Sequence, residues 1–403
     1  MSTLNILDEI YDWEQRKLGD IGETFSGLSG KNINDFGHGD ANFITYMNVF
    51  SNSIADLRGT EHVEIDSKQN QVIYGDILFT TSSETPEEVG MSSVWLGHTK
   101  NTYLNSFCFG YRILEKPNFD SYYMAYLLRA KKFRKRMTVL AQGISRYNIS
   151  KKQVMNTFVN FPTIEEQRRI GKHLFLIDRT ITLHEEKQRQ LEQLKKALLQ
   201  KMFADETGYP VFRFKGFTEK WEQRKLGEIA DVYDGVHQTP DYQDSGVMFL
   251  SVENIKTLKS NKYISEKAFE KKFKIFPEQG DILMTRIGDI GTTNIVQTSK
   301  RLGYYVSLAL LKPKNIASHY LNSVIATPSF QISLKRRSLL TATPQKINKD
   351  EIGKVYFFMP HNLQEQEKIG QFFQSLDKTI TLHDKKIQYL KQLKRGLLQK
   401  MFI

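Results

Sequence analysis

The chain has few of the residues that build covalent cross-links, metal cages or membrane spans. Its 403 residues include one cysteine, Cys108, which excludes an internal disulfide framework and a Cys-rich zinc site and favours a reducing compartment. The neighbouring phenylalanines predict that this thiol is buried. No apolar run approaches the roughly 20 residues that span a bilayer, and the first residues lack the basic-then-apolar pattern of a signal peptide. We therefore expect a cytoplasmic protein that does not contact a membrane.

Motifs of nucleic-acid enzymes are also missing. The ten prolines include no Pro-Pro pair, which the Asn/Asp-Pro-Pro-aromatic motif of an adenine methyltransferase requires. The Gly-Lys pairs at 30–31 and 171–172 lack the upstream glycine and the following Ser or Thr of a phosphate-binding loop. Asp178, Glu185 and Lys187 could form a metal-dependent nuclease site, but ordinary surface charges on a helix are the favoured interpretation. We expect no catalysis, no bound cofactor and no metal site in this chain.

What the chain does contain is a long internal repeat. The sequence Trp-Glu-Gln-Arg-Lys-Leu-Gly at 13–19 returns unchanged at 221–227, and about half of the positions in 164–203 are identical in 363–402. A period of about 200 residues is far longer than that of solenoids or propellers, so each copy is a whole domain with a connector. Two similar domains imply two similar targets.

Each copy changes from strand-like to helix-like patterning. Short β-branched runs, such as those at 71–74 and 77–80, are interrupted by Gly, Asn, Asp and Pro, which predicts a β-rich domain with long loops. After a proline at 162 or 360, apolar residues recur with the period of a helix, and Leu194 and Leu393 fall in the two apolar stripes. Forty helical residues span about 60 Å. We expect the two helices to pair through these stripes as an antiparallel coiled coil.

The stripes also predict which side chains pair the helices. They are Ile177, Ile181, His184, Leu191, Leu198, Leu376, Ile380, His383, Leu390 and Leu397. The two histidines occupy equivalent places and could bridge a metal ion, but two ligands are too few for a closed zinc site. A polar residue that fixes the register, as a buried Asn does in coiled coils, is the favoured interpretation.

The net charge of +12 favours a polyanionic partner, since excess Lys and Arg attract phosphate backbones. Basic residues cluster at 129–136 and 335–337, each cluster after a predicted helix, at 121–128 and 320–325. A solvated helix face is the alternative interpretation of these clusters.

The order of these parts resembles the DNA specificity subunit of type I restriction-modification systems. The resemblance rests on the Trp-led segments at 13–21 and 221–229, the Gly-Asp-Ile-Leu turns at 75 and 280, the junctions at 162–167 and 360–366, and the Leu-Leu-Gln-Lys-Met-Phe endings at 198 and 397. It implies an α+β fold in which two β-rich target recognition domains alternate with two long helices as a pseudo-twofold repeat. The implied parts are a first recognition domain (1–162), a first helical spacer (163–204), a linker (205–220), a second recognition domain (221–360) and a second helical spacer (361–403).

In that family the subunit is not an enzyme on its own. The resemblance implies that each domain reads one half of a bipartite, asymmetric site in double-stranded DNA, and that the helices set the spacing and dock two methyltransferase subunits. Two restriction subunits would complete the nuclease. S-adenosylmethionine would bind to the methyltransferase partner, and ATP and Mg²⁺ to the restriction partner. Two alternatives stay open: a coiled-coil scaffold whose β-domains bind proteins, and a recognition subunit of a methyltransferase that lacks a restriction partner.

Base reading is expected where the two copies differ most, in three pairs of loops. They are the early loops at 31–40 and 236–241, the loops after the Gly-Asp turns at 81–85 and 286–294, and the segments at 143–148 and 341–346. Arg can bond a guanine edge, Asn an adenine edge, and Glu can accept from cytosine. The base-reading candidates are Ser82, Ser83, Glu84, Arg146, Tyr147, Asn148, His237, Gln238, Arg286, Thr292, Thr293, Asn294, Gln345 and Lys346. The candidates for contacts with the DNA backbone are Lys31, Lys132, Arg134, Lys151, Lys335 and Arg336. For each residue the alternative is an exposed loop position that contacts only phosphate or nothing.

Overall fold

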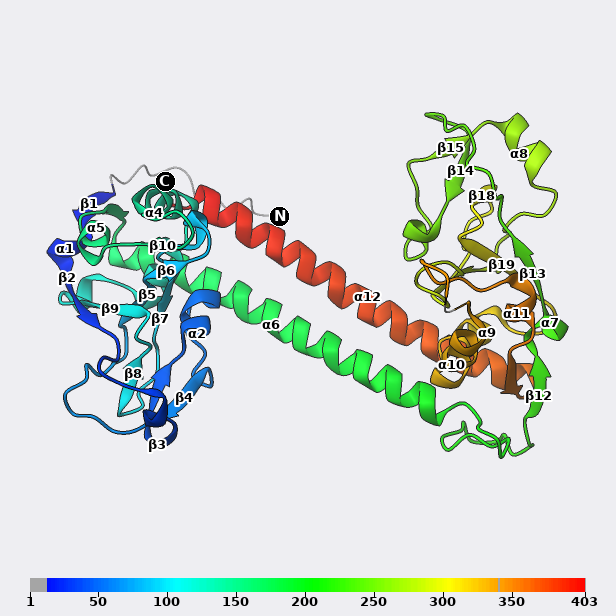
Figure 1. Cartoon of the computed structure of the whole chain (residues 1–403), viewed down its shortest axis with the longest axis horizontal. Helices are drawn as coiled ribbons and strands as arrows, with labels where there is room; N and C mark the ends of the chain where they lie inside the picture. Colours follow the sequence, from blue (N-terminus) through cyan, green and yellow to red (C-terminus); the bar gives the residue numbers. More distant parts are fainter. Residues whose placement is uncertain (1–12, 340, 403) are drawn as a thin grey trace. The chain divides into compact units, whose positions relative to one another are not determined.

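The computed structural model describes residues 13–339 and 341–402, which form two compact units. Unit 1 contains the described residues up to His184 together with those from Lys386 onward, and unit 2 contains residues 185–385. Both boundaries fall inside long helices, α6 (Ile164–Lys201) and α12 (Leu363–Lys400). Each unit therefore includes a part of both helices (Figure 1).

Unit 1 is built on two sheets whose strands are not in chain order. The larger sheet has the order β2-β9-β5-β7 and the smaller has the order β4-β3-β8. These strands are β2 (Gly22–Ser26), β3 (Phe36–Ile44), β4 (Thr60–Val63), β5 (Ile77–Thr80), β7 (Ser92–Val94), β8 (Thr102–Leu104) and β9 (Cys108–Ile113). Two further pairs join β1 (Glu14–Lys17) to β11 (Phe158–Phe161) and β6 (Ser82–Ser83) to β10 (Tyr147–Asn148). The helices are α1 (Leu18–Ile21), α2 (Tyr46–Ser51), α3 (Ser121–Leu127), α4 (Lys131–Leu140) and α5 (Lys151–Met155), with short 3-10 turns η1 (Ile33–Asp35), η2 (Pro86–Glu88) and η3 (Lys116–Asn118).

Unit 2 repeats this topology (Figure 1). Its sheets have the orders β13-β19-β16-β17 and β15-β14-β18, and β12 pairs with β20. The strands are β12 (Glu222–Lys225), β13 (Ala230–Asp234), β14 (Val247–Leu250), β15 (Tyr263–Ile264), β16 (Ile282–Thr285), β17 (Thr293–Ile295), β18 (Leu302–Tyr304), β19 (Leu308–Pro313) and β20 (Tyr356–Met359). The helices are α7 (Leu226–Ile229), α8 (Glu266–Lys272), α9 (Ser318–Ile325), α10 (Pro328–Arg337) and α11 (Lys349–Gly353), with one 3-10 turn, η4 (Val252–Asn254). The predicted pair of β-rich domains is confirmed as one strand order used twice.

The central strands β5 and β16 are buried on both faces. Ile77 and Phe79 of β5 lie in one apolar core, whereas Leu78 lies in another, because successive side chains of a strand point to opposite faces. In β16 the alternation is the same, with Ile282 in one core and Leu283 in the other. A strand between two cores must be apolar at every position, which explains the unbroken runs after the Gly-Asp turns. Each core residue of this size contributes about 1.5–3 kcal/mol through its burial.

Two glycines let the long helices approach the β-rich parts closely. A side chain at Gly171 of α6 would meet the backbone nitrogen of Tyr123 in α3, and a Cβ at Gly370 of α12 would lie 2.6 Å from the backbone nitrogen of Tyr320 in α9. Because the repeat relates these contacts, the start of each long helix is packed in the same way on its own unit.

Within each unit the two helices pair in antiparallel fashion. In unit 2, Lys195 of α6 binds Asp377 of α12 with Nζ–Oδ1 at 2.5 Å, and Phe203, just after α6, lies 5.7 Å from Phe373 between ring centroids. The partner residue number falls as α6 advances, which defines the antiparallel direction. In unit 1, Lys394 binds Asp178 at 2.6 Å beside a small apolar cluster. That cluster comprises Ile177, Ile181, Ile387 and Leu390.

The basic clusters follow α3 and α9, as expected, and lie mostly within helices of their own, α4 and α10. Two expectations from the sequence are wrong. Residues 71–74 are not a strand, because the backbone N–H of Ile73 donates to Asp76 Oδ2 at 2.8 Å in a turn. Leu194 and Leu393 are 48% and 38% exposed rather than buried in the helix pair. Toward its end, α6 packs Leu198 and Leu199 against the β-rich core of unit 2.

Candidate nucleic-acid interface

In unit 2 the three predicted reading loops meet at one buried arginine. The side chain of Arg286, which is 6% exposed, forms an ion pair with Asp234 at the end of β13 and donates from Nε to the carbonyl of Ile347 at 3.0 Å. Burial lowers the pKa of this guanidinium from its ordinary value. The backbone N–H of Gly288 also donates to the carbonyl of Gln345 at 2.8 Å. Arg286 thus joins the loops around 236, 288 and 345, and its Nε and Nη1 are bonded within the protein.

The exposed side chains around this joint are the other candidates in these loops. His237, Gln238, Gln345 and Lys346 are exposed. The imidazole of His237 lies 4.0 Å from Asp234, next to the arginine. These side chains, unlike that of Arg286, face solvent and can reach a ligand.

The remaining candidates of unit 2 lie at the start of β17. Thr292 is the last residue of the loop, and its hydroxyl donates to Asp289 at 2.7 Å. Thr293 and Asn294 belong to the strand rather than to the loop expected from the sequence. The side-chain amide of Asn294 donates to the carbonyls of Ile255 and Lys256 at 2.9 and 3.1 Å, so it holds a neighbouring loop in place.

In unit 1 two of the three predicted loops meet. Pairing of β6 with β10 brings Ser82 and Ser83 against Tyr147 and Asn148. Arg146 is exposed, yet it donates to the hydroxyl of Ser82 at 3.2 Å. Both serines are buried, and Tyr147 is partly exposed, whereas Asn148 is exposed. Glu84, in the next loop, is also exposed.

The early loop of unit 1 makes its polar contacts elsewhere. Lys31 binds Asp66 with Nζ–Oδ2 at 3.0 Å. A backbone N–H donated by Lys68, with Lys31 as the second cause, lowers the pKa of Asp66 to about 2. His38 contacts Glu64 in the same region at 2.9 Å. The early loop is therefore held against the segment after β4.

The arginines of the first basic cluster bind the protein itself. Arg129 donates to the carbonyls of Val49, Phe50, Asn52 and Ser92 at 2.6–2.9 Å, three of them at the C-terminal end of α2. Burial lowers its pKa to about 10. Arg134 likewise donates to three carbonyls, those of Glu87, Val89 and Gly90. These guanidinium groups satisfy backbone acceptors that have no other partner in a helix end or a tight loop.

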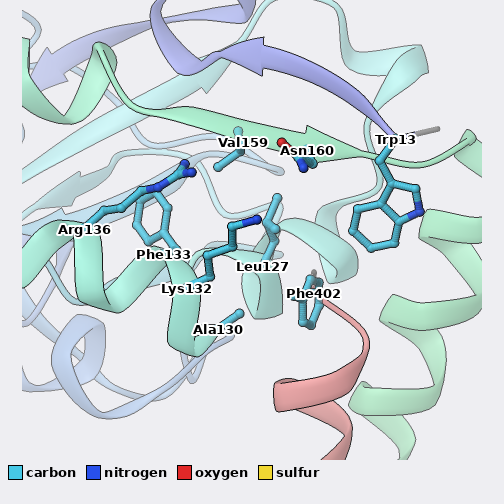
Figure 2. A pocket seen from close by; sticks show the side chains of 9 residues that line it. All are labelled: Trp13, Leu127, Ala130, Lys132, Phe133, Arg136, Val159, Asn160 and Phe402. Atoms are coloured by element: carbon cyan, nitrogen blue, oxygen red, sulfur yellow. The ribbon is translucent and has the colours of Figure 1, made fainter.

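The lysines of α4 remain at the surface. Lys131, Lys132 and Lys135 are exposed. Figure 2 shows Lys132 beside a shallow hollow that Trp13 and Phe402 also line. The cluster predicted for phosphate contacts thus divides into internal arginines and surface lysines.

The other backbone candidates differ in the same way. Lys335 and Arg336, near the end of α10, are exposed. Lys151 donates to the hydroxyl of Ser26 at 2.8 Å and lies 5.9 Å from the ring centroid of Phe109. Its ammonium is therefore anchored over the larger sheet of unit 1.

The helix-pairing candidates occupy the buried or half-buried positions of α6 and α12. Ile181 and Leu390 are each 7% exposed. The partly buried members are Ile177, His184, Leu191, Leu198, Leu376, Ile380, His383 and Leu397.

Sequence reasoning missed two ion pairs and one exposed side chain. Asp178 and Asp377 are repeat equivalents, as are Lys195 and Lys394, so the two helix-pairing ion pairs are copies of each other. The repeat could have revealed these ion pairs, because the aspartate and the lysine of α6 both return in α12 at the same sequence offset. Ile144, at the tip of the loop before β10, is 95% exposed.

The part of the chain that the structure describes contains no group of three or more His, Cys, Asp or Glu side chains that could hold a metal ion. None of its helices is both long and apolar enough to cross a bilayer. Cys108 is buried, as predicted, and burial raises the pKa of its thiol to about 12.

Solved structures share this architecture. An S subunit of a type I restriction-modification system from M. genitalium aligns over 100% of this chain and 99% of that one, with a TM-score of 0.66 and 15% identity. A chain from a study of complex assembly and conformational transition of the type I R-M system covers 97% of both chains, with a TM-score of 0.54 and 18% identity. At these identities the likeness shows the fold.

Sequence comparisons show the family. The chain is 24% identical to the type I restriction enzyme MjaVIII specificity subunit of Methanocaldococcus jannaschii, over 96% of this chain and 91% of that protein. It is equally similar to the putative MjaX specificity subunit of the same organism, over 96% and 92%. The model of the type I restriction modification DNA specificity domain matches residues 11–193 and again 218–392. The chain, with two copies of that domain, belongs to the family of type I restriction-modification specificity subunits.

Proposed function

We propose that each unit reads one half of a bipartite, asymmetric site in double-stranded DNA. The observation that carries this proposal is the contrast between an identical strand order and unlike loops. Both units hold the segment before an isoleucine, Ile149 or Ile347, beside the end of the central strand, yet unit 1 presents Arg146 there and unit 2 presents Gln345 and Lys346. Different side chains on one frame suit different base sequences, because bases are read by the donors and acceptors of individual side chains.

The surface lysines supply the contacts that do not depend on sequence. Lys132 and Lys135 on α4, and Lys335 and Arg336 on α10, are exposed cations near the reading hairpins in the chain. Lys and Arg that neutralise phosphates fix the register of a protein on the duplex without specifying bases. The excess positive charge of the chain fits this role.

The long helices set the spacing of the half-sites and dock two methyltransferase subunits. Each helix is a continuous stretch of 38 residues, and ion pairs that are equivalent in the repeat hold the two together. Leu183 and Leu382, which are also equivalent, are 58% and 57% exposed. An exposed leucine repeated at the same point of both helices fits a partner that binds twice.

The chemistry belongs to the partners in this proposal. The methyltransferase subunits bind S-adenosylmethionine, and two restriction subunits bind ATP and Mg²⁺. The chain itself contributes recognition and geometry, and it works in the cytoplasm, where the DNA lies.

Methylation mapping tests the proposal. The chain is expressed with its cognate methyltransferase in cells, and the modified adenines are located by sequencing. We expect one motif with two specified halves separated by a gap of fixed length. A single continuous motif, or the same methylation without this chain, would refute it. Omission of the restriction subunit should leave the motif unchanged.

A further inference from the structure

We propose that Ile144 is a specificity-determining residue of unit 1 whose side chain contacts the 5-methyl group of a thymine in the major groove. The inference rests on the proposed function, because it names one contact of the same recognition surface. It concerns a residue whose apolar character distinguishes it from the polar base-reading candidates.

The exposure of Ile144 has no explanation within the fold. At 95%, it is the most exposed of the large apolar side chains in the part of the chain that the structure describes. Burial in a core would stabilise the protein, whereas a β-branched apolar side chain in water contributes nothing to folding. The residues on either side, Gly143 and Ser145, offer it no apolar cover.

The backbone that carries this side chain is nevertheless held in place. Gln142 and Asn148 exchange two backbone hydrogen bonds of 2.9 and 2.8 Å, which close a hairpin with Ile144 near its tip. Gly143 has a φ of 139°, and a Cβ at this position would collide with the carbonyl oxygen of Arg146. A glycine is therefore required for this turn.

The hairpin is attached firmly to the core. Its second strand, β10, pairs with β6, and the N–H of Ile149 donates to the carbonyl of Thr81 at 3.0 Å, directly after β5. An ordered tip loses little conformational entropy when it binds, which favours a specific contact.

Cations accompany the apolar tip. Arg146 in the same hairpin is exposed, with its guanidinium 5.7 Å from the ring centroid of Phe107. Helix α4, which carries the exposed Lys132 and Lys135, ends at Leu140, two residues before the hairpin closes. An exposed apolar group beside cations fits the major groove of DNA, where phosphates flank the bases and the thymine methyl is the apolar group displayed. A protein partner would instead be expected to meet a broad apolar patch.

The test compares thymine with uracil, which lacks only the methyl group. Once the motif is known from methylation mapping, each thymine of its two halves is replaced in turn by deoxyuridine in synthetic duplexes. Affinity is measured for the complex of the full chain with its methyltransferase. For the natural chain we expect a loss of about 4-fold to 10-fold at one position of one half-site. We expect Ile144→Ala to bind the thymine duplex as weakly as the natural chain binds the uracil duplex. Replacement of thymine by uracil should cause this variant no further loss of affinity.

Two variants serve as controls. Ile144→Val keeps most of the apolar surface and should retain most of the uracil penalty. Val139→Ala removes a side chain of α4 that is 84% exposed but lies outside the hairpin, and it should change neither affinity nor the uracil penalty. Because Ile144 is exposed, the melting temperature of Ile144→Ala should equal that of the natural complex.

Three results would overturn the inference. The first is a loss of affinity with uracil that persists in Ile144→Ala. The second is an effect of Val139→Ala as large as that of Ile144→Ala, and the third is a motif whose two halves contain no A·T pair. The proposed function fails separately, if the natural complex methylates no bipartite motif at all. A bipartite motif with unchanged penalties in Ile144→Ala would remove the contact with thymine and leave the proposed function intact.

Discussion

Lengthening α6 and α12 together by four residues tests the spacing that we propose for the half-sites. The insertions follow His184 and Lys385, at the boundaries of the units, so that the pairs Asp178–Lys394 and Lys195–Asp377 stay within their units. Four helical residues add about 6 Å to a helix. One base pair of B-DNA adds about 3.4 Å. The added length lies between one and two base pairs, so we expect the gap to grow by one or two base pairs.

The assay is methylation mapping in cells that express the lengthened chain with its methyltransferase. Both halves of the motif should be unchanged, because every contact inside each unit is retained. As a control, the same four residues are inserted after Lys215, an exposed position of the linker before β12, and the gap should keep its length. Insertion into α6 alone should lower the melting temperature, since it shifts one helix against the other. An unchanged gap in a folded, active complex with both insertions would refute the role of the helices in spacing.

Further substitutions test docking, reading and folding separately. Leu183→Lys and Leu382→Lys should each reduce the number of methyltransferase subunits that co-purify with the chain from two to one. The control is Leu176→Lys, at an exposed position whose repeat equivalent is Ser375, and it should leave both subunits bound. Arg286→Ala should relax base specificity at many positions of one half-site, because it frees three loops at once; a loss of specificity confined to one base would contradict this expectation. Lys132→Ala should weaken binding evenly across DNA sequences and reduce the slope of log K against log salt by about 0.9. Arg129→Met should lower the free energy of unfolding by about 3 kcal/mol or more in chemical denaturation, since it leaves four partly buried carbonyls without this donor. Lys132→Met should change the free energy of unfolding by less than about 0.5 kcal/mol.

The parts of the fold that were predictable are those in which one local pattern decides the structure. The 38-residue helices α6 and α12 follow from an apolar period that continues without a proline. Strands β5 and β16 follow from unbroken apolar runs after a Gly-Asp turn. The repeat then implied that both domains share a frame, and the two strand orders agree.

The parts that were not predictable depend on contacts between distant residues. The run at 71–74 has the composition of a strand, but Asp76 captures the backbone N–H of Ile73 and turns the chain. The guanidinium groups of Arg129 and Arg134 look like phosphate ligands in the sequence, and only the carbonyls that surround them show that they hold loops. Arg286 is a similar case, because Asp234 is 52 positions away in the chain.

The two units show how one fold can carry different side chains at the same point of a loop. Thr81 and Arg286 follow equivalent strands, and each accepts a 3.0 Å hydrogen bond at its carbonyl from the N–H of an isoleucine, Ile149 or Ile347. The backbone thus fixes where the hairpin lies, and the side chain at this position is free to differ. In unit 2 an arginine fills the space and joins three loops, whereas in unit 1 a threonine leaves room for Arg146 to reach the hydroxyl of Ser82. Since main-chain atoms hold this segment in both units, it can accept new side chains at little cost to stability, as the proposed reading of two different half-sites requires.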